Sequence, residues 1–217
     1  MFLSRVELNP YRRETMRALG SPQIMHAAVM ASFDSFSSER SDERVLWRID
    51  RVGPSTYLLI QSGDRPDLHH IVDQFGRPDT GQTGDTIDYE PFISGIESGQ
   101  TWRFRLRANP VRNVPSGEPN VRGKICHHVT SEQQLKWLLD RSEGLGVSMV
   151  NDGVPTVSIV QREKRTFDRK GSKVTISMVT FEGVLTVVDR DRFLQSLRNG
   201  IGRAKAYGCG MITIARP

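Results

Sequence analysis

Four glycines and two cations are concentrated in residues 198–214 of this 217-residue chain. Glycine permits a backbone with positive φ and lets a ligand approach the main-chain amides, which together can form a concave anion site. The cations add positive charge, so the stretch suits a phosphate. A glycine-rich connection without a ligand would have the same composition, and both interpretations stay open. The residues are Gly200, Gly202, Gly208 and Gly210, with Arg203 and Lys205.

The order of the predicted elements around these glycines excludes two nucleotide-cofactor motifs. A dinucleotide fingerprint needs a strand before the glycines and a helix after them. Here a predicted helix, 189–197, comes first and a predicted strand, 211–214, follows. A Walker loop needs Ser or Thr directly after its Lys, whereas Ala206 follows Lys205. We therefore expect no nucleotide cofactor.

The five histidines suit acid–base chemistry better than metal binding. Zinc sites use about four ligands with separated spacings, and consecutive residues on a strand point to opposite faces. We therefore expect no metal site among the pairs His69–His70 and His127–His128. Metal-free cleavage is possible on RNA, where the 2′-hydroxyl attacks the adjacent phosphorus and a group titrating near neutrality moves the proton. His26, at the edge of an apolar helix stripe, is the candidate, although a lone histidine there is more often structural.

Basic residues outnumber acidic ones, giving a net charge of +5, and only six of the 30 Lys and Arg residues are Lys. The planar guanidinium matches phosphate oxygens, so this excess favours a nucleic-acid partner, although a GC-rich genome would also produce it. Strand 102–108 alternates apolar residues with Arg103, Arg105 and Arg107, which places the three cations about 7 Å apart on one face. This face is predicted to meet an anion or to be a solvated sheet surface.

A predicted hairpin, 157–167 and 174–181, carries a second group of cations around its turn. A basic β-ribbon can follow a phosphate backbone, whereas Lys and Arg also protect exposed strand edges. Both an RNA-binding and a merely solvated hairpin stay open. Its cations are Arg162, Lys164, Arg165, Arg169, Lys170 and Lys173.

The order of the elements predicts an α+β protein with two tandem ferredoxin-like (βαββαβ) domains. In the first half, a strand at 2–8 precedes a helix from Ser21–Pro22 to about Phe36, a hairpin at 45–60, a weak helix near 70, a mobile loop at 76–99 and strand 102–108. The second half repeats this order from a short strand at 124–129. We expect domains at 1–110 and 124–217, joined by a connection at 111–123. No stretch is apolar enough to span a membrane, and we expect a cytoplasmic protein.

Several motifs together resemble the CasE (Cse3) family, the type I-E CRISPR RNA-processing endoribonucleases of the repeat-associated mysterious protein superfamily. The resemblance extends from Phe2 to Ile214. The glycine-rich loop alone marks the superfamily, and its combination with the other motifs is specific to the family. The motifs are Leu8-Asn-Pro10, Met25-His26, Leu46-Trp-Arg48, Phe104-Arg-Leu-Arg-Ala-Asn-Pro110, Phe181-Glu-Gly183 and Gly200–Gly210.

The resemblance implies cleavage of the CRISPR repeat transcript at the base of its stem-loop. The chemistry would need no metal or cofactor and would leave a 2′,3′-cyclic phosphate. The product would stay bound, and other Cascade subunits would be partners. His26 corresponds to the catalytic histidine, the hairpin 162–173 to the element that grips the RNA stem, and Arg203 and Lys205 lie in the glycine-rich loop.

One departure from the family pattern leaves the second catalytic group open. Some members carry a tyrosine three residues before the histidine and a lysine five residues after it. This chain has Gln23 and Ala31 there, so Tyr11, Tyr207 or a basic residue could replace them. Two other functions also remain: a non-catalytic RNA-binding scaffold of the same superfamily, and a ferredoxin-like module for a metabolite or a protein.

Overall fold

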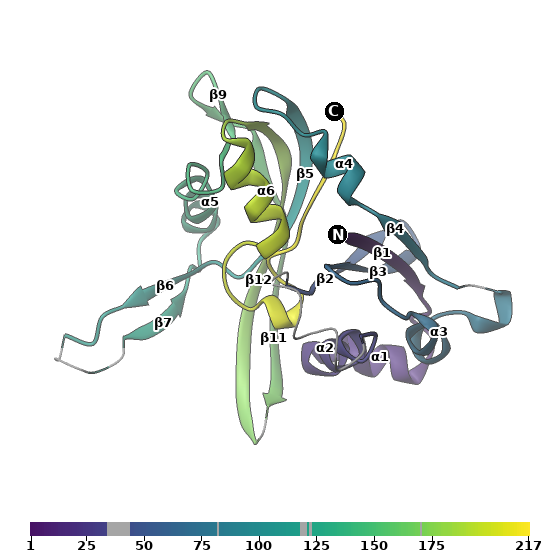
Figure 1. Cartoon of the computed structure of the whole chain (residues 1–217). Helices are drawn as coiled ribbons and strands as arrows, with labels where there is room; N and C mark the ends of the chain where they lie inside the picture. The colour runs from purple at the N-terminus through teal and green to yellow at the C-terminus, as the bar shows by residue number, and fades with distance from the viewer. Residues whose placement is uncertain (34–43, 82, 118–120, 122, 170) are drawn as a thin grey trace.

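The computed structural model describes residues 1–33, 44–81, 83–117, 121, 123–169 and 171–217. It consists of two antiparallel sheets with helices packed on them, which confirms the α+β class (Figure 1). The predicted helix end at Phe36 and the hairpin residue Lys170 lie outside the described residues. No helix among the described residues is long and apolar enough to cross a membrane.

The first sheet has the strand order β2-β3-β1-β4. Helices on one of its faces bury alternate strand residues, and Val6, Leu58, Ile60, Met25 and Ile71 belong to this core. Helix α2 begins with Pro at its first position, as predicted, because the ring fixes a helical φ and no amide is needed there. The elements are β1 (Phe2–Leu8), α1 (Arg13–Gly20), α2 (Pro22–Met30), β2 (Leu46–Val52), β3 (Ser55–Ser62), α3 (His69–Phe75), η1 (Pro78–Thr80) and β4 (Asp85–Asp88).

The second sheet has the strand order β11-β12-β5-β13, with β8 paired to β12. Helices α5 and α6 cover one face, where Leu106, Trp137, Phe181, Leu185 and Phe193 form the core. The elements are α4 (Glu90–Ser94), β5 (Thr101–Ala108), α5 (Ser131–Leu139), β8 (Val147–Ser148), β11 (Val157–Arg169), β12 (Ser172–Val187), α6 (Arg190–Asn199), η2 (Lys205–Tyr207) and β13 (Ile212–Ala215).

The position of β5 corrects one expectation. We expected this strand to close the first sheet, but it pairs with β12 and β13 at the centre of the second. The first sheet is closed by β4, which lies in the segment that we expected to be a mobile loop. The apolar face of β5 packs in the second core, and alternation alone could not identify its partners.

The segment expected to be a simple connection, 111–123, begins a two-stranded ribbon. β6 (Val111–Val114) pairs with β7 (Lys124–His127), and the ribbon projects from the second sheet (Figure 1). A smaller hairpin joins β9 (Val150–Asn151) to β10 (Val154–Pro155). The expected strand at 124–129 therefore ends at His127.

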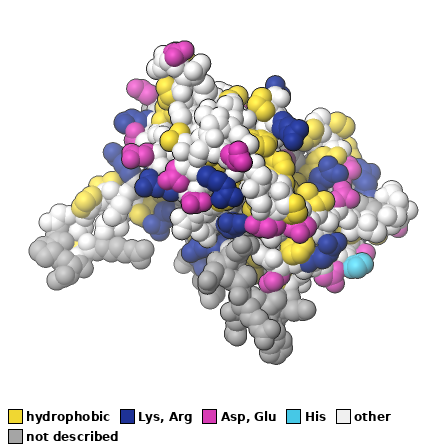
Figure 2. Space-filling model, turned by 45° about the horizontal axis from the view of Figure 1, so that its top comes forward, with side chains coloured by type: hydrophobic (Ala, Val, Ile, Leu, Met, Phe, Trp, Pro, Cys, Tyr) yellow, Lys and Arg dark blue, Asp and Glu magenta, His cyan; other side chains and the backbone are white. Residues whose placement is uncertain are grey.

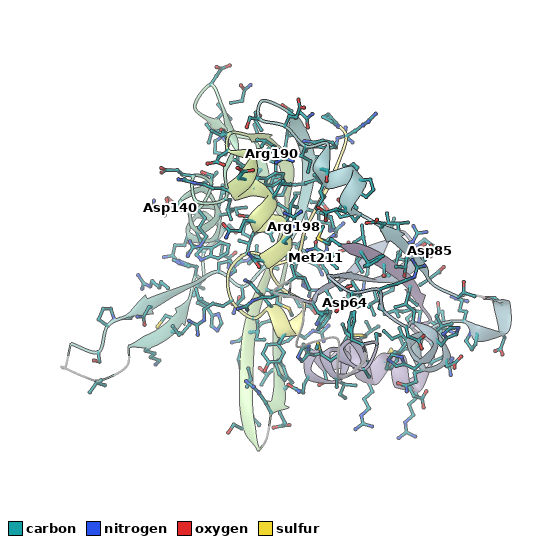
Figure 3. All side chains as sticks on the ribbon, in the orientation of Figure 1. Asp64, Asp85, Asp140, Arg190, Arg198 and Met211 are labelled. Atoms are coloured by element: carbon teal, nitrogen blue, oxygen red, sulfur yellow. The ribbon has the colours of Figure 1, made fainter. Side chains whose placement is uncertain are left out.

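A buried arginine links the two sheets. Arg48 on β2 is only 1% exposed and pairs with Asp50 at 2.7 Å. Its guanidinium also donates to the carbonyl oxygens of Arg105 and Met211, at 2.9 and 3.1 Å, and to Thr213 Oγ1 at 2.8 Å. A buried charge is tolerated only with such full hydrogen bonding. Figure 3 labels Met211, which precedes β13, and Arg198 of α6.

Candidate active site

His26 lies on α2, which packs against both η2 and the hairpin strand β11. Consecutive helical residues are about 100° apart, so Met25 is fully buried in the first core while the His26 ring is half-buried at its edge. His26 Nδ1 is buried and has no hydrogen-bond partner among the described residues. Because the ring is half-buried, it is not sealed in the core.

The electrostatic surroundings keep His26 neutral near pH 7. Burial lowers the pKa of the imidazole, and the nearby positive charge of Arg169 lowers it further. A neutral imidazole can accept a proton, so the free protein presents His26 as a base. Arg169 is exposed at the end of β11 and supplies a cation close to this base.

The β11–β12 hairpin has two faces with different surroundings. We call the set Gln161, Glu163, Arg165, Phe167 and Arg169 the inner face, because it is directed toward η2 and α2. Phe167 packs on Tyr207 of η2 with ring centroids 4.9 Å apart. Because strand side chains alternate, Arg169 follows Phe167 on the same face and so comes close to His26.

The opposite set, Arg162, Lys164 and Lys173, forms the outer face. A register shift between Ile159 and Gln161 separates this part of β11 from the part that packs under the helices. Arg162 donates to Ser131 Oγ at 3.3 Å and to the Val129 carbonyl oxygen, beside the start of α5. Lys164 and Lys173 are exposed. The predicted basic hairpin therefore presents its cations in two directions.

Two of the three arginines of β5 do not belong to the open cationic face that we considered, whereas Arg103 is exposed. Arg105 pairs with Asp50 at 3.4 Å and with Glu182 at 2.9 Å. Arg107 pairs with Glu163 of the inner face. Both guanidiniums thus meet protein carboxylates between the sheets, and direct contact with a phosphate stays a prediction. Glu182 is the residue paired with Arg105 in the strand register, a partner that only the folded sheet identifies.

Close packing accounts for two of the loop glycines. A Cβ on Gly208 would lie 2.7 Å from the Trp47 ring, and one on Gly200 would lie 2.8 Å from the Leu46 side chain. Both residues also have positive φ, at 76° and 69°. The amide of Gly210 donates to the Arg107 carbonyl oxygen at 2.6 Å. The loop therefore has a structural role in packing against β2 of the first sheet.

The loop cations differ in exposure. Arg203 is exposed, whereas Lys205 of η2 is half-buried near α2. Burial lowers the pKa of Lys205, and the charge of Arg44 lowers it further. The sequence analysis missed Arg44, which lies just before β2 and carries no motif. On the face shown in Figure 2, Lys and Arg side chains lie beside Asp and Glu side chains over most of the surface.

Three of the other four histidines have hydrogen-bond partners for their rings among the described residues. His69 Nδ1 lies 2.6 Å from Asp67 on the surface, and His70 Nε2 lies 2.9 Å from the Ala28 carbonyl oxygen. His127 Nδ1 lies 3.1 Å from Asn109 Oδ1. Within the described part of the chain, no group of three or more His, Cys, Asp or Glu side chains is placed to hold a metal ion.

Known proteins share this sequence and fold. A family model described as "CRISPR associated protein" matches residues 1–216. The chain is 31% identical to the CRISPR-associated endoribonuclease Cse3 of Thermus thermophilus over 224 aligned residues, covering 99% of this chain and all of the relative. It is 31% identical over 163 residues to the CRISPR system Cascade subunit CasE of Escherichia coli, covering 72% of this chain and 79% of that protein.

A solved structure agrees over the whole chain. A structure of the CRISPR endoribonuclease Cse3 bound to 19 nt RNA superposes with a TM-score of 0.83 at 30% identity, covering 99% of this chain and 100% of the other. The chain belongs to the CasE (Cse3) family of CRISPR-associated proteins.

Proposed function

We propose that the chain is a metal-independent endoribonuclease that cleaves CRISPR repeat stem-loops in precursor CRISPR RNA and keeps the product as a Cascade subunit in the cytoplasm. One relative is named an endoribonuclease and another a Cascade subunit, and these names support the proposed RNA substrate and the proposed partners. A structure with RNA that represents a pre-cleavage complex supports the reaction. The observation that carries the proposal is a half-buried His26 beside the cationic hairpin, with its pKa lowered by burial and by Arg169.

His26 is the proposed base of the reaction. Its neutral imidazole accepts the proton of the 2′-hydroxyl, and the 2′-oxygen then forms a bond to the adjacent phosphorus. The bond to the 5′-oxygen breaks, that oxygen takes up a proton, and a 2′,3′-cyclic phosphate remains. Arg169 offsets the negative charge that develops on the phosphate oxygens, since a preplaced cation costs no reorganisation during the reaction.

The hairpin is the proposed grip on the RNA stem. The outer face, with Arg162, Lys164 and Lys173, would bind phosphates of the stem, and Lys170 belongs to the same prediction. Arg165 and Arg169 of the inner face lie closer to the cleavage site. Arg105 and Arg107 pair with carboxylates of the protein, so we propose that they hold the RNA-binding surface in place. Arg203 and Lys205 would line the RNA path beside the glycine-rich loop, Gly200–Gly210.

We also propose that the chain consists of two tandem ferredoxin-like units. The strand order β4-β1-β3-β2 and the order β13-β5-β12-β11 follow the same pattern, in which the first strand of a unit lies between its fourth and third. A helix follows the first and third strands in both units. This pattern supports a division of the chain before Thr101, at the start of β5, instead of the predicted 110.

The test is cleavage of a labelled repeat hairpin by the wild-type protein and by His26→Ala, with EDTA present. We expect His26→Ala to lose about 10²–10⁴-fold in cleavage rate while its affinity for the hairpin stays unchanged. His69→Ala is the matched control, because His69 is exposed and pairs with Asp67. Full activity of His26→Ala would overturn the catalytic assignment.

Two results would favour the other functions. Tight, salt-dependent binding without cleavage by the wild-type protein would indicate the RNA-binding scaffold. An affinity for hairpin RNA that does not change with salt would favour a module for a metabolite or a protein.

A further inference from the structure

A cavity of about 60 Å³ lies between the two sheets, on the same side as α2. We call it the interface cavity. Its floor consists of the buried residues Met25, Trp47 and Met178, and Tyr207 of η2 forms one wall. Polar side chains of β11 line its more exposed part, among them Gln161. The cavity therefore combines an apolar, aromatic interior with polar groups near its mouth, as small-molecule sites do.

Two buried donors at the interface cavity have no hydrogen-bond partner among the described residues. They are Trp47 Nε1 and Arg107 Nε, and both side chains line the cavity. An unsatisfied buried donor is destabilising, so such groups usually have a partner. A polar group placed in the cavity can accept hydrogen bonds from these donors.

The size and the lining identify the kind of group. A cavity needs about 10–15 Å³ to hold one water molecule, so the interface cavity has room for roughly four to six waters. This volume is similar to that of one planar heterocycle. The apolar floor disfavours a phosphate, because burying a charge against Met and Trp side chains is costly. The carboxylate of Glu163, which already pairs with Arg107 and Arg165, would also repel a phosphate. An aromatic ring with polar edges fits all of these surroundings.

Unpaired nucleobases are recognised by this combination of groups. Proteins stack splayed RNA bases on aromatic rings or guanidinium planes and hydrogen bond their edges. Trp47 and Tyr207 supply aromatic surfaces, Arg165 a guanidinium, and Gln161 and Glu163 hydrogen-bonding groups.

The interface cavity is close to the proposed cleavage site. Met25 on its floor directly precedes His26 on α2. Arg165 and Arg169 lie on the same face of β11, four residues or about 13 Å apart, a distance that roughly two nucleotides of single-stranded RNA can span. Arg51 is exposed at the cavity, where a cation can hold the phosphate of the bound nucleotide.

We propose that the interface cavity binds one unpaired nucleobase of the RNA substrate, next to the scissile phosphate, and thereby fixes the register of cleavage. The base lies against Trp47 and Tyr207, and its edge bonds with Gln161 and Glu163. This inference rests on the proposed function, since it assigns a base-specific site to the same RNA.

The first experiment measures base insertion without cleavage. A repeat hairpin carries a 2′-deoxy nucleotide at the cleavage site, so that it binds and stays intact, and 2-aminopurine replaces one unpaired base at a time. We expect the fluorescence to be quenched on binding at one position. Gln161→Trp, which fills the mouth of the cavity, should abolish this quenching. Ser158→Trp is the matched control, because Ser158 is exposed on the same strand and does not line the cavity.

The second experiment measures single-turnover cleavage of hairpins with one abasic nucleotide. At the position that gave quenching, the wild-type protein should lose roughly tenfold or more in rate, the size of one lost stacking contact. Gln161→Trp should cleave the intact and abasic hairpins at similar, low rates. Equal rates on every abasic hairpin, or quenching that survives Gln161→Trp, would mean a cavity filled by water and overturn the inference. Failure of the proposed function is a separate result, namely no His26-dependent cleavage of the intact hairpin.

Discussion

Both β5 and β11 carry three arginines, but the two strands use most of them differently. On β5, the Arg105 and Arg107 side chains are only 28% and 12% exposed and pair with carboxylates between the sheets. On β11, Arg162 and Arg169 are exposed. Two of the three β5 arginines are therefore used in ion pairs within the protein, as is Arg165 of β11, whereas two of the three β11 arginines remain exposed.

The difference follows from the position of each strand in the sheet. β5 is central, so neighbouring segments bring Asp50 and Glu182 to Arg105. β11 is at the edge of the sheet, and its far end extends beyond the helices as part of the hairpin (Figure 1). An edge strand has a neighbour on one side only, so fewer of its cations meet a protein carboxylate. The location of the carboxylates thus decides what an arginine does.

The largest effect is expected at the buried arginine between the sheets. Arg48→Met leaves the carboxylate of Asp50 without its main cation, and breaking a buried pair costs about 3–5 kcal/mol of unfolding free energy. Urea denaturation measures this loss. Arg51→Met, on the same strand but exposed, is the control and should change the unfolding free energy by about 0.5 kcal/mol or less. A similar small change for Arg48→Met would mean that this arginine does not hold the sheets together.

The next effect concerns RNA affinity and the exposed hairpin cations. Replacing Lys164, Arg169 and Lys173 by Gln removes three phosphate contacts, so the slope of log affinity against log salt should decrease by about 3. Binding titrations of a repeat hairpin at several salt concentrations measure the slope. The unfolding free energy should change little, because all three side chains are exposed. An unchanged slope would show that the hairpin is only a solvated edge.

A smaller effect, on unfolding free energy, distinguishes an arginine paired within the protein from one that binds RNA. Arg105→Gln removes pairs with Asp50 and Glu182, and we expect a loss of about 1–3 kcal/mol in unfolding free energy. The salt dependence of RNA binding should stay the same, since this guanidinium is used within the protein. A reduced salt slope in this variant would instead place Arg105 on the RNA and weaken the comparison.

The smallest effect is a shift in pH dependence. Burial and Arg169 both lower the pKa of His26, so removing the cation in Arg169→Gln should raise that pKa toward its usual value. The neutral base is then lost at a higher pH, and the acidic limb of kcat/KM should move to higher pH. Lys164→Gln is the control and should leave the limb in place. A limb that does not move would mean that another group titrates in this range.

The sequence predicted elements better than their pairing. Alternation identified residues 101–108 as a strand, but its neighbours, β12 and β13, come from much later in the chain. β4 was missed because its four residues are mostly exposed and show no apolar alternation. Helix α1 was missed because Thr15 and Ala18 are its only fully buried residues among basic neighbours.

The candidate site was also predicted only in part, because local patterns do not show which distant segments come together. The helical angle between Met25 and His26 placed the imidazole at the edge of the core, and its half-buried position confirms this. The proximity of Arg169 depends on the hairpin folding back toward α2, which no local pattern indicates. The register shift near Val160, which separates the two hairpin faces, has no signal in the sequence either.

The position of β13 late in the chain affects when the two sheets can be joined during protein synthesis. Met211 and Thr213 supply two of the groups that bind Arg48, and β13 completes the second sheet beside β5. Early domains generally fold first while a chain leaves the ribosome. The first sheet has all of its strands by residue 88, whereas two of the groups that bind Arg48 are translated only with residues 211 and 213. A nascent chain therefore lacks the complete hydrogen bonding between its two sheets until β13 has been translated.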